Sequence, residues 1–322
     1  MRASKGGGYE VKMKTLSPFS LAGRFWRGNI HTHSNQSDGA LPTEDVVNAY
    51  KNAGYDFLML SEHFIHHFNW PINDTRKFRS NDFTTLIGVE LHAPETSAGE
   101  LWHIVAAGLP LDFPPCGPNE TGDELARRAR AAGAFIGIAH PAWSQLTLQD
   151  GLAIDAAHAV EIYNHGCAIE NDRGEGWYLH DQLLNEGKRL TAFATDDAHF
   201  KGPDYFGGWV NVKAQSLDPD VLLQALKDGH YYASQGPELH TITHDKKELS
   251  VSCSPVDTIT VVCGHSRSCV KTGKAITSAT FDLANLEKGW LLKRLSPWFR
   301  VTVIDHAGKR AWSNPYWWDE LG

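Results

Sequence analysis

Short apolar runs alternate with amphipathic stretches between residues 28 and about 196 of the chain. Each apolar run spans four to six residues and then turns abruptly polar, which is typical of a buried strand. These predicted strands lie within GNIHTHS, YDFLMLSEH, TTLIGVEL, LWHIVAAG, AFIGIAHP, AVEIYN and LTAFATDDAH. The amphipathic stretches predict helices at 42–54, 121–133, 177–187 and 218–229. We expect Thr43 to cap the first helix and Gly54 to end it, and the second to run from Thr121 to Gly133.

The repeated order of strand, helix and strand predicts right-handed β-α units around a mostly parallel sheet or barrel. In such folds the loops at the C-terminal ends of the strands meet on one face, where ligands bind. After Gly236-Pro237 the pattern changes to short alternating runs, in LHTITH, ELSVSCS, TITVVCG, ATFDL and WFRVTVID. We therefore predict an N-terminal extension at 1–27, a barrel at 28–234 and a small antiparallel β unit at 235–322. The tryptophans of this unit should pack internally or against the barrel rather than bind sugar: Trp298, Trp312, Trp317 and Trp318.

Composition narrows the class of protein. The formal net charge of −8, from 30 basic and 38 acidic side chains, argues against a dedicated nucleic-acid partner. The five cysteines are widely spaced, odd in number and without a C-x-x-C pair, which disfavours disulfides and thiolate zinc sites. No run of 18 apolar residues is present, and MRASKGGGYEVKMK lacks the apolar core of a signal peptide. We expect a cytoplasmic protein without a membrane association, and the sequence leaves its oligomeric state open.

Histidine and acidic residues gather at the ends of the predicted strands. His31 and His33 end the first strand, where residues two apart share a face, so both imidazoles can reach one ion. Asp38 follows within Ser37-Asp38-Gly39, and Gly39 allows the loop to turn sharply. The candidate ligands at or near strand ends are His31, His33, Asp38, His63, Glu90, His103, His140, Asp197 and His199. Each alone is a weak signal, but together they predict a zinc, manganese or iron site, since neutral imidazole and carboxylate suit these metals.

These motifs, in the order HTHSNQSDG, SEH, GVE, WHI, IAHP and DDAH, resemble those of the polymerase and histidinol phosphatase (PHP) family of metal-dependent phosphoesterases. The resemblance covers about residues 28–200. The segment from GGWVNVKA through YYASQGP, which resembles a PHP-associated element, extends it to about 237. The resemblance implies a distorted seven-stranded β/α barrel with a two- or three-metal site at the C-terminal ends of the strands.

The resemblance also implies how the ligands divide among the ions. One ion would be held by His31, His33, Glu90 and Asp197. Glu90 would bridge to a second ion on His103 and His140, and a third would lie on Asp38, His63 and His199. His92 competes with His103, because Glu90 and His92 share a face if the strand continues, but His103 occupies the family's apolar His-Ile-Val position. This chain has Ser61-Glu62-His63 where the family often has Thr-Asp-His, which keeps the ligand and changes the acid beside it.

The leading functional hypothesis is hydrolysis of a phosphomonoester or a small phosphodiester by a metal-bridging hydroxide, with two or three Mn2+, Zn2+ or Fe2+ ions as cofactors. Neither a G-x-S-x-G elbow nor a P-loop is present. The predicted catalytic residues are Glu90, Asp197, His199 and His165; the leaving-group acid is open among His165, Asp196 and His199. The predicted contacts to a small, phosphorylated substrate are His66, Trp143, Arg173 and Lys201, and further candidates are His67, Trp70, Tyr163, Asn164 and His165.

Other functions stay open. PHP-like barrels with this kind of YASQGP segment and β tail also resemble carbamate and carboxylic-ester hydrolases, including a carbaryl-hydrolase-like subgroup, and the weakly basic loops here keep that activity in view. Amidohydrolases also begin with HxH, but they lack the Ser-Asp-Gly element and the final Asp-x-His. A non-catalytic metal- or ligand-binding protein is disfavoured because all nine ligand positions are filled. An exonuclease is disfavoured by the net charge and by the lack of a basic strip with interleaved aromatics.

Overall fold

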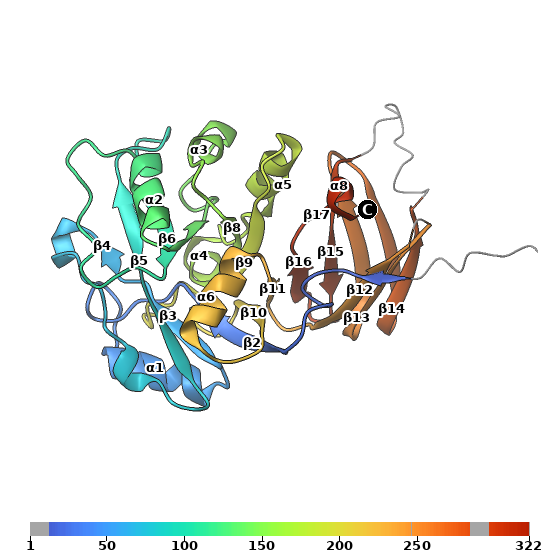
Figure 1. The fold of residues 1–322 in the computed structure, drawn as a ribbon, viewed down its shortest axis with the longest axis horizontal. Coiled ribbons are helices and arrows are strands. Elements are labelled where there is room, and N and C mark those ends of the chain that lie inside the picture. Colours follow the sequence, from blue (N-terminus) through green and yellow to red (C-terminus); the bar gives the residue numbers. More distant parts are fainter. Residues whose placement is uncertain (1–12, 246, 284–295, 322) are drawn as a thin grey trace, which may run out of the picture.

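The computed structural model describes residues 13–245, 247–283 and 296–321. It has an α/β region followed in the chain by a β-rich C-terminal region (Figure 1). Residues 1–12 of the expected N-terminal extension lie outside the described part. The rest of that segment contributes to the fold, because β1 (Lys14–Thr15) pairs with β12 (Leu239–His244) of the C-terminal region. β2 (Arg24–Asn29) also begins before residue 28.

Each of the apolar runs expected to form the barrel overlaps a strand. After β2 come β3 (Phe57–Leu60), β4 (His63–Phe64), β5 (Thr84–Ala93), β6 (Trp102–Ala107), β7 (Phe135–Ile138), β8 (Ala159–Asn164) and β9 (Thr191–Thr195). They pair in the order β2–β3–β5–β6–β7–β8–β9, and β4 also lies beside β5. Only β6 runs antiparallel to its two neighbours in this series, so the expected mixed α/β fold with a mostly parallel sheet is confirmed.

The sheet does not close into a complete barrel. β2 is already paired on both sides, in parallel with β3 and antiparallel with β10 (Trp209–Ala214). β9 therefore finds no free edge on β2, and in the described residues the two are joined only beyond the end of β2, by an isolated parallel bridge from Thr32 to Ala198. The closed seven-stranded barrel is thus not confirmed. The bridge nevertheless brings the chain after β9 against the chain after β2.

All four predicted helices are present: α1 (Thr43–Asn52), α2 (Gly122–Ala131), α5 (Trp177–Asn185) and α6 (Pro219–Lys227). Thr121 caps α2 with a capping box, as its pattern suggests. The prediction of Thr43 as an N-cap is wrong, because Pro42 occupies that position and Thr43 is the first helical residue. The Thr43 hydroxyl instead accepts a hydrogen bond from Asn73 Nδ2.

Several short helical segments were not predicted, because one or two turns give no helical periodicity. They are α3 (Leu148–Ala153), α4 (His165–Asn171), α8 (Trp318–Leu321) and the 3-10 turns η1 (His66–Phe68) and η2 (Arg76–Phe78). α4 follows β8 directly, and the Asn164 side chain caps it by accepting from Cys167 N. This short helix places new residues beside the site described below.

The C-terminal region is an antiparallel β structure. After β11 (Tyr231–Ser234) and β12, its strands are β13 (Glu248–Cys263), β14 (Ser268–Asp282), β15 (Trp298–Ile304), β16 (Arg310–Ser313) and β17 (Tyr316–Trp317). The runs ELSVSCS and TITVVCG, expected as separate strands, form the single strand β13 with register shifts along it. The hydrophobic core of this C-terminal region includes Ile242, Val261 and Phe299.

The tryptophans of this region pack within it or against the α/β region, as predicted. Trp298 is fully buried with Leu184 of α5 and with Trp317, and its Nε1 donates to Asn185 Oδ1 at 3.2 Å. Trp312 is buried in another cluster, and Trp318 packs on Phe299. A nearly buried ion pair between Arg300 and Asp181 reinforces the contact with α5. Arg300 Nε and Nη2 lie 2.9 and 2.8 Å from the two Asp181 carboxylate oxygens. The five cysteines are free, and no described helix is long and apolar enough to cross a membrane.

Candidate metal centre

The candidate ligands meet where β2 and β9 end. Asp197 N donates to the His31 carbonyl at 2.8 Å, and His33 N donates to the Ala198 carbonyl at 2.9 Å. These bonds hold the HxH segment beside the Asp-x-His segment, as expected for residues that share an ion. Asp197 has a left-handed backbone, with φ of 53°, a conformation that costs energy for a residue with a Cβ. The interlocked backbone bonds hold this strained residue with its carboxylate facing His31 and His33.

A first group surrounds the Asp197 carboxylate. Asp197 Oδ1 lies 3.3 Å from His31 Nε2 and 3.0 Å from His33 Nε2. Glu90 Oε2 lies 3.5 Å from each of the same two nitrogens. Ligands bound to one ion at about 2 Å lie roughly 3 Å from one another. This group therefore has the spacing of a shared coordination shell.

A second group forms on the other oxygen of Glu90. Glu90 Oε1 lies 2.6 Å from His103 Nδ1 and 3.1 Å from His140 Nε2. Glu90 is fully buried at the centre of the cluster; its Oε1 faces this group, and its Oε2 faces the first group and also lies 2.7 Å from His63 Nδ1. One carboxylate thus faces both expected ion positions.

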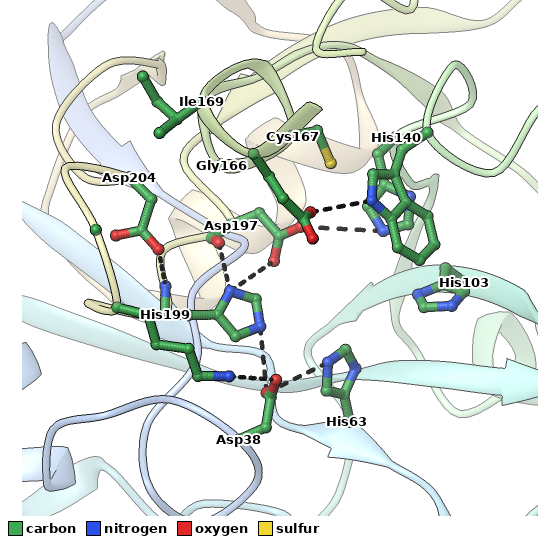
Figure 2. A pocket seen from close by; sticks show the side chains of 14 residues that line it. Asp38, His63, His103, His140, Gly166, Cys167, Ile169, Asp197, His199 and Asp204 are labelled. Atoms are coloured by element: carbon green, nitrogen blue, oxygen red, sulfur yellow. Dashed lines mark hydrogen bonds and ion pairs between the residues drawn. The ribbon is translucent and has the colours of Figure 1, made fainter. Parts of the chain in front are cut away.

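A third group lies around Asp38. Asp38 Oδ1 is 3.4 Å from His63 Nε2 and 3.2 Å from His199 Nε2, and Figure 2 shows the three side chains turned towards one another. The loop that carries Asp38 is compact because of Gly39, where a Cβ would come within 2.8 Å of the His33 backbone carbonyl. Gly39 therefore serves a close backbone approach, which is the sharp turn that the sequence suggested.

His92 is a further neighbour of this cluster. β5 continues to Ala93, so His92 does share a face with Glu90, and its Nε2 lies 3.0 Å from His63 Nδ1 and 4.0 Å from Glu90 Oε2. His92, His103, His63 and Glu90 together form one group with metal-ligand spacing. His103 makes the shorter contact with Glu90, so it stays the better candidate, and His92 lies in reach of the same ion.

The donor set is suited to cations. The buried atoms at the centre that make no hydrogen bond are His31 Nε2, His33 Nε2, Asp38 Oδ1, Glu90 Oε2 and Asp197 Oδ1. Buried polar atoms without a hydrogen bond are costly, and here they all converge on one another. Imidazole nitrogens and carboxylate oxygens at this spacing match zinc, manganese or iron. The residues therefore fit the group of divalent ions that the sequence resemblance implies.

Hydrogen bonds at the far side of the rings fix the tautomers of two ligand imidazoles. His199 Nδ1 lies 2.8 Å from the Asp197 carbonyl oxygen, which can only accept, so Nδ1 carries the hydrogen. His31 Nδ1 likewise faces the Glu161 carboxylate at 3.1 Å. In the neutral rings the lone pair is then on Nε2, the nitrogen that faces the cluster. This is the arrangement that a metal ligand requires.

The electrostatics of the cluster favour ionised carboxylates. Burial opposes the charged form of Glu90, but the surrounding imidazoles, first among them His103, hold its pKa well below the usual range. Burial also opposes the charged form of His199, yet the Asp38 and Asp197 carboxylates outweigh it and raise its pKa to about 9. His33 behaves in the opposite way, because burial and the neighbouring His63 lower its pKa to about 3.

The cluster opens into a pocket of about 550 Å³ (Figure 2). The candidate ligands that line it are Asp38, His63, His103, His140, Asp197 and His199. Of the expected substrate contacts, Trp143 and Lys201 line it as well. Trp143 stands edge-on to His140 and His103, with ring centroids 5.1 and 5.4 Å apart, and Lys201 Nζ lies 3.0 Å from Asp38 Oδ2.

Other expected site residues are not among those that line this pocket. Arg173 is exposed just beyond α4, and His66 is exposed in η1, where it packs on Trp70. His165 is half-buried, and its Nδ1 lies 2.9 Å from the Tyr163 hydroxyl. Asp196 is buried and accepts from Tyr50 OH at 2.7 Å and from three backbone N–H groups of residues 206–208. Among the three candidate acids, only His199 lines the pocket.

The structure also reveals buried carboxylates that support the ligands; of these, the sequence pointed only to Glu62, as the acid beside His63. Glu62 accepts from Ser34 and, at 2.6 Å, from the Ser37 hydroxyl, and so secures the loop that carries Asp38. Asp204 accepts from the backbone N–H groups of His199 and Phe200. The signal for Glu161 was present: it is the one charged residue in the apolar run AVEIYN. α4 further adds Ile169 and Glu170 to the pocket lining.

No protein-family model matches the chain, and no curated protein matches it. The fold is similar to that of a two-domain protein from Bacteroides vulgatus ATCC 8482 containing a predicted PHP-like metal-dependent phosphoesterase. The alignment has a TM-score of 0.49 and 16% identity and covers 88% of this chain and 92% of that one. A candidate metal-dependent phosphoesterase from Bifidobacterium adolescentis ATCC 15703 aligns with a TM-score of 0.42 and 15% identity, over 62% and 95% of the two chains. An amidohydrolase from Chromobacterium violaceum aligns with a TM-score of 0.37 and 15% identity, over 55% and 89%.

Proposed function

We propose that this protein is a metal-dependent hydrolase that cleaves a phosphomonoester or a small phosphodiester. The observation that carries the proposal is that buried imidazole nitrogens and carboxylate oxygens without hydrogen bonds converge beneath an open pocket. A fold gains no stability from collecting such atoms unless a cation satisfies them. A purely structural role for the cluster would not require a pocket at its surface.

In this proposal the three groups hold two or three divalent ions, which are Mn2+, Zn2+ or Fe2+. When bound, such ions lower the pKa of coordinated water and neutralise charge on the phosphoryl oxygens and the leaving oxygen. The chain's own contribution is to fix their positions. Glu90 sets the spacing between the first two groups through its two oxygens, and Asp197 orients His31 and His33 towards the same point.

The pocket walls suit a substrate with one anionic end and one apolar end. Trp143 forms an apolar wall next to His103 and His140, and its Nε1 donates to Glu170 at 3.1 Å, which holds the indole in place. Ile169 adds a second apolar side chain to the lining of the pocket. Lys201 lies near Asp38 on the side of the third group. We therefore place the phosphoryl group over the cluster, within reach of Lys201, and the organic group against Trp143.

A second candidate function is hydrolysis of carbamate or carboxylic esters on the same site. The observation that favours it is the weakly basic pocket: Lys201 is the one Lys or Arg side chain among the described residues that line it. Lys201 also already pairs with Asp38. A pocket built for a dianion usually presents more positive side chains, although bound ions would supply charge of their own.

The test is a metal analysis followed by parallel assays. Protein purified without chelator should contain manganese, zinc or iron in at least two equivalents. It should hydrolyse p-nitrophenyl phosphate or its bis-ester when that metal is added, and a chelator should abolish the activity. Hydrolysis of a naphthyl carbamate alone would favour the second candidate. Stoichiometric metal without hydrolysis of any of the three substrates would contradict both.

A further inference from the structure

Glu161 is a fully buried carboxylate in the middle of β8, beneath the candidate metal centre. Its Oε1 faces His31 Nδ1 at 3.1 Å and also accepts from the Thr195 hydroxyl. Its Oε2 accepts from the backbone N–H of His140 at 2.7 Å and from Asn164 Nδ2 at 3.0 Å. Each oxygen therefore receives two hydrogen bonds, and a neutral His31 must present Nδ1–H to make its own.

These bonds join ligands that come from three different strands. His31 follows β2 and is bound directly by Glu161, and His140 follows β7 and is bound through its backbone. Asp197 follows β9 and is reached through Asn164, whose Nδ2 also lies 3.1 Å from Asp197 Oδ2. One side chain thus fixes the relative positions of ligands from both groups that share Glu90.

The backbone at His140 shows why this position needs an anchor. His140 has φ of 20°, which lies outside the regions that residues with a Cβ normally adopt. The charge-assisted bond from its N–H to Glu161 is short, and such bonds are about twice as strong as neutral ones. The anchor compensates for the strained backbone, and it directs His140 Nε2 to Glu90.

We propose that Glu161 is the positioning residue that sets the tautomer of His31 and the register of His31, His140 and Asp197, and thereby the affinity of the site for two of its ions. The proposal rests on the proposed function in that it takes the cluster to bind metal. Glu161 binds no ion itself, because both of its oxygens are directed to other partners. Its carboxylate acts through His31, where an acceptor on Nδ1–H raises the basicity of the Nε2 lone pair.

The chemistry of the four partners makes Glu161→Gln a sharp test. All four groups around the carboxylate donate hydrogen bonds when His31 has the tautomer described above, and a glutamine offers one accepting oxygen and one donating NH2. In one orientation the NH2 group meets His31 Nδ1–H and the Thr195 hydroxyl, which can rotate to accept, and in the other it meets the N–H groups of His140 and Asn164. Glu161→Gln therefore loses either the bond to His31 or the bonds to His140 and Asn164, although the side-chain size is unchanged.

The experiment is a calorimetric titration of metal-depleted protein with Mn2+ and, separately, Zn2+. Supporting residues of this kind change metal affinity by about 10- to 100-fold. We expect Glu161→Gln to weaken binding by that factor for two equivalents together. We expect Ser144→Ala, which removes only the hydroxyl 3.1 Å from His140 Nδ1, to weaken at most one. At saturating metal, Glu161→Gln should recover part of its kcat, with an unchanged KM for the organic substrate.

The matched control is Asp150→Asn. Asp150 is also a buried carboxylate, but its bonds go to Ser97 and Thr147 and to none of the ligand residues. This variant should lose stability and keep wild-type metal affinity. If Glu161→Gln does not fold, Glu161→Asp keeps the charge and both oxygens but shortens the reach. We then expect Glu161→Asp to bind metal more weakly than the wild type. Its circular dichroism spectrum should match that of the wild type, which would show that the fold is intact.

The outcomes separate this inference from the proposed function. Wild-type metal affinity in Glu161→Gln, or in Glu161→Asp where that variant is needed, would overturn the positioning role and leave the hydrolase proposal intact. Loss of one equivalent only would also overturn it, because Glu161 would then support a single ion. A wild-type protein that binds metal tightly but hydrolyses no ester would overturn the proposed function and leave the role of Glu161 testable by titration alone.

Discussion

Glu90 Oε1 lies 2.6 Å from His103 Nδ1, at the centre of a cluster in which the other oxygen of Glu90 faces different imidazoles. Because Oε1 faces His103 and His140 while Oε2 faces the group around Asp197, Glu90 sets the distance between the ions that these two groups are proposed to hold. No other candidate ligand has this position.

The first prediction follows from that position. Glu90→Gln keeps the side-chain size but removes a negative charge. The remaining ligands then no longer compensate the repulsion between two neighbouring cations. We expect the variant to lose at least one equivalent of metal and nearly all turnover, measured by elemental analysis and steady-state kinetics. Glu100→Gln, at an exposed glutamate, should behave as the wild type. Full metal content and activity in Glu90→Gln would rule out the bridging role.

The second prediction concerns the phosphate-binding side chain. The sequence suggested both Arg173 and Lys201, but only Lys201 lines the pocket. We expect Lys201→Ala to raise KM for a phosphorylated substrate severalfold with metal content unchanged, because the contact forms in the ground state as well as in the transition state. Arg173→Ala, at an exposed position outside the pocket lining, is the control and should leave KM unchanged. An unaltered KM in Lys201→Ala would shift support to the ester-hydrolase candidate.

The third prediction concerns the apolar wall. If the organic group of the substrate packs on Trp143, Trp143→Ala should raise KM for p-nitrophenyl phosphate by about tenfold, which corresponds to about 1.4 kcal/mol of aromatic contact. KM for methyl phosphate should change much less. The control is Trp177→Ala, at an exposed tryptophan that does not line the pocket. Equal changes for both substrates would place the organic group elsewhere.

The metal ligands could be predicted from the sequence because of where they occur. His31 and His33 come soon after β2 and Asp197 soon after β9, and the ends of such strands meet at one edge of the sheet. The residue types alone then identified the chemistry. The same reasoning did not predict the incomplete barrel, because nothing in the pattern of WVNVKA shows that β10 pairs with β2 and takes the edge that β9 would need.

The substrate contacts were harder to predict, because loop positions depend on local backbone geometry. Arg173 follows Asp172, whose left-handed φ of 61° ends α4 and turns the chain away from the helix that lines the pocket. Ile169, which does line the pocket, carries no chemical signature. Glu161 bonds ligand residues directly and Glu62 bonds the loop that carries Asp38, and the sequence does not reveal the partners of a single buried acid.

The fourth prediction concerns the C-terminal β region. Trp298 and Arg300 bind α5 through Asn185 and Asp181, so the region shares a core with the α/β part. We expect truncation after residue 234 to lower the melting temperature and to expose apolar surface, detected by dye binding. In the full chain, Trp298→Ala should cost about 3–5 kcal/mol of unfolding free energy in urea titrations. Val270→Ala, at an exposed site of β14, should change it by less than about 0.5 kcal/mol. An unchanged melting temperature after truncation would make the region an independent module.

The last prediction concerns stability against pH, at histidines outside the metal centre. His180 in α5 is fully buried, with Nε2 donating to the Leu190 carbonyl at 3.1 Å. Burial lowers its pKa to about 4, and the Asp181 carboxylate opposes this only in part, since Arg300 lies beside it. His158 is similar: its Nδ1 accepts from Ile136 N, and burial, then the charges of Arg130 and Lys227, lower its pKa to about 4.

Both shifts have the same sign. In the unfolded chain each histidine has a pKa near 6.5 and is protonated below that pH. In the folded chain the same histidine stays neutral until about pH 4, so the unfolded state binds more protons between these two pH values. Stability should therefore fall as the pH decreases from about 6.5 to about 4, by up to about 1.4 kcal/mol per pH unit for each group. Urea unfolding of metal-depleted protein across this range measures the slope, and metal depletion removes the pH dependence of ion binding. His180→Gln and His158→Gln should each flatten the slope, and the double variant should flatten it by the sum. A wild-type slope in both single variants would show that neither histidine is held neutral by the fold.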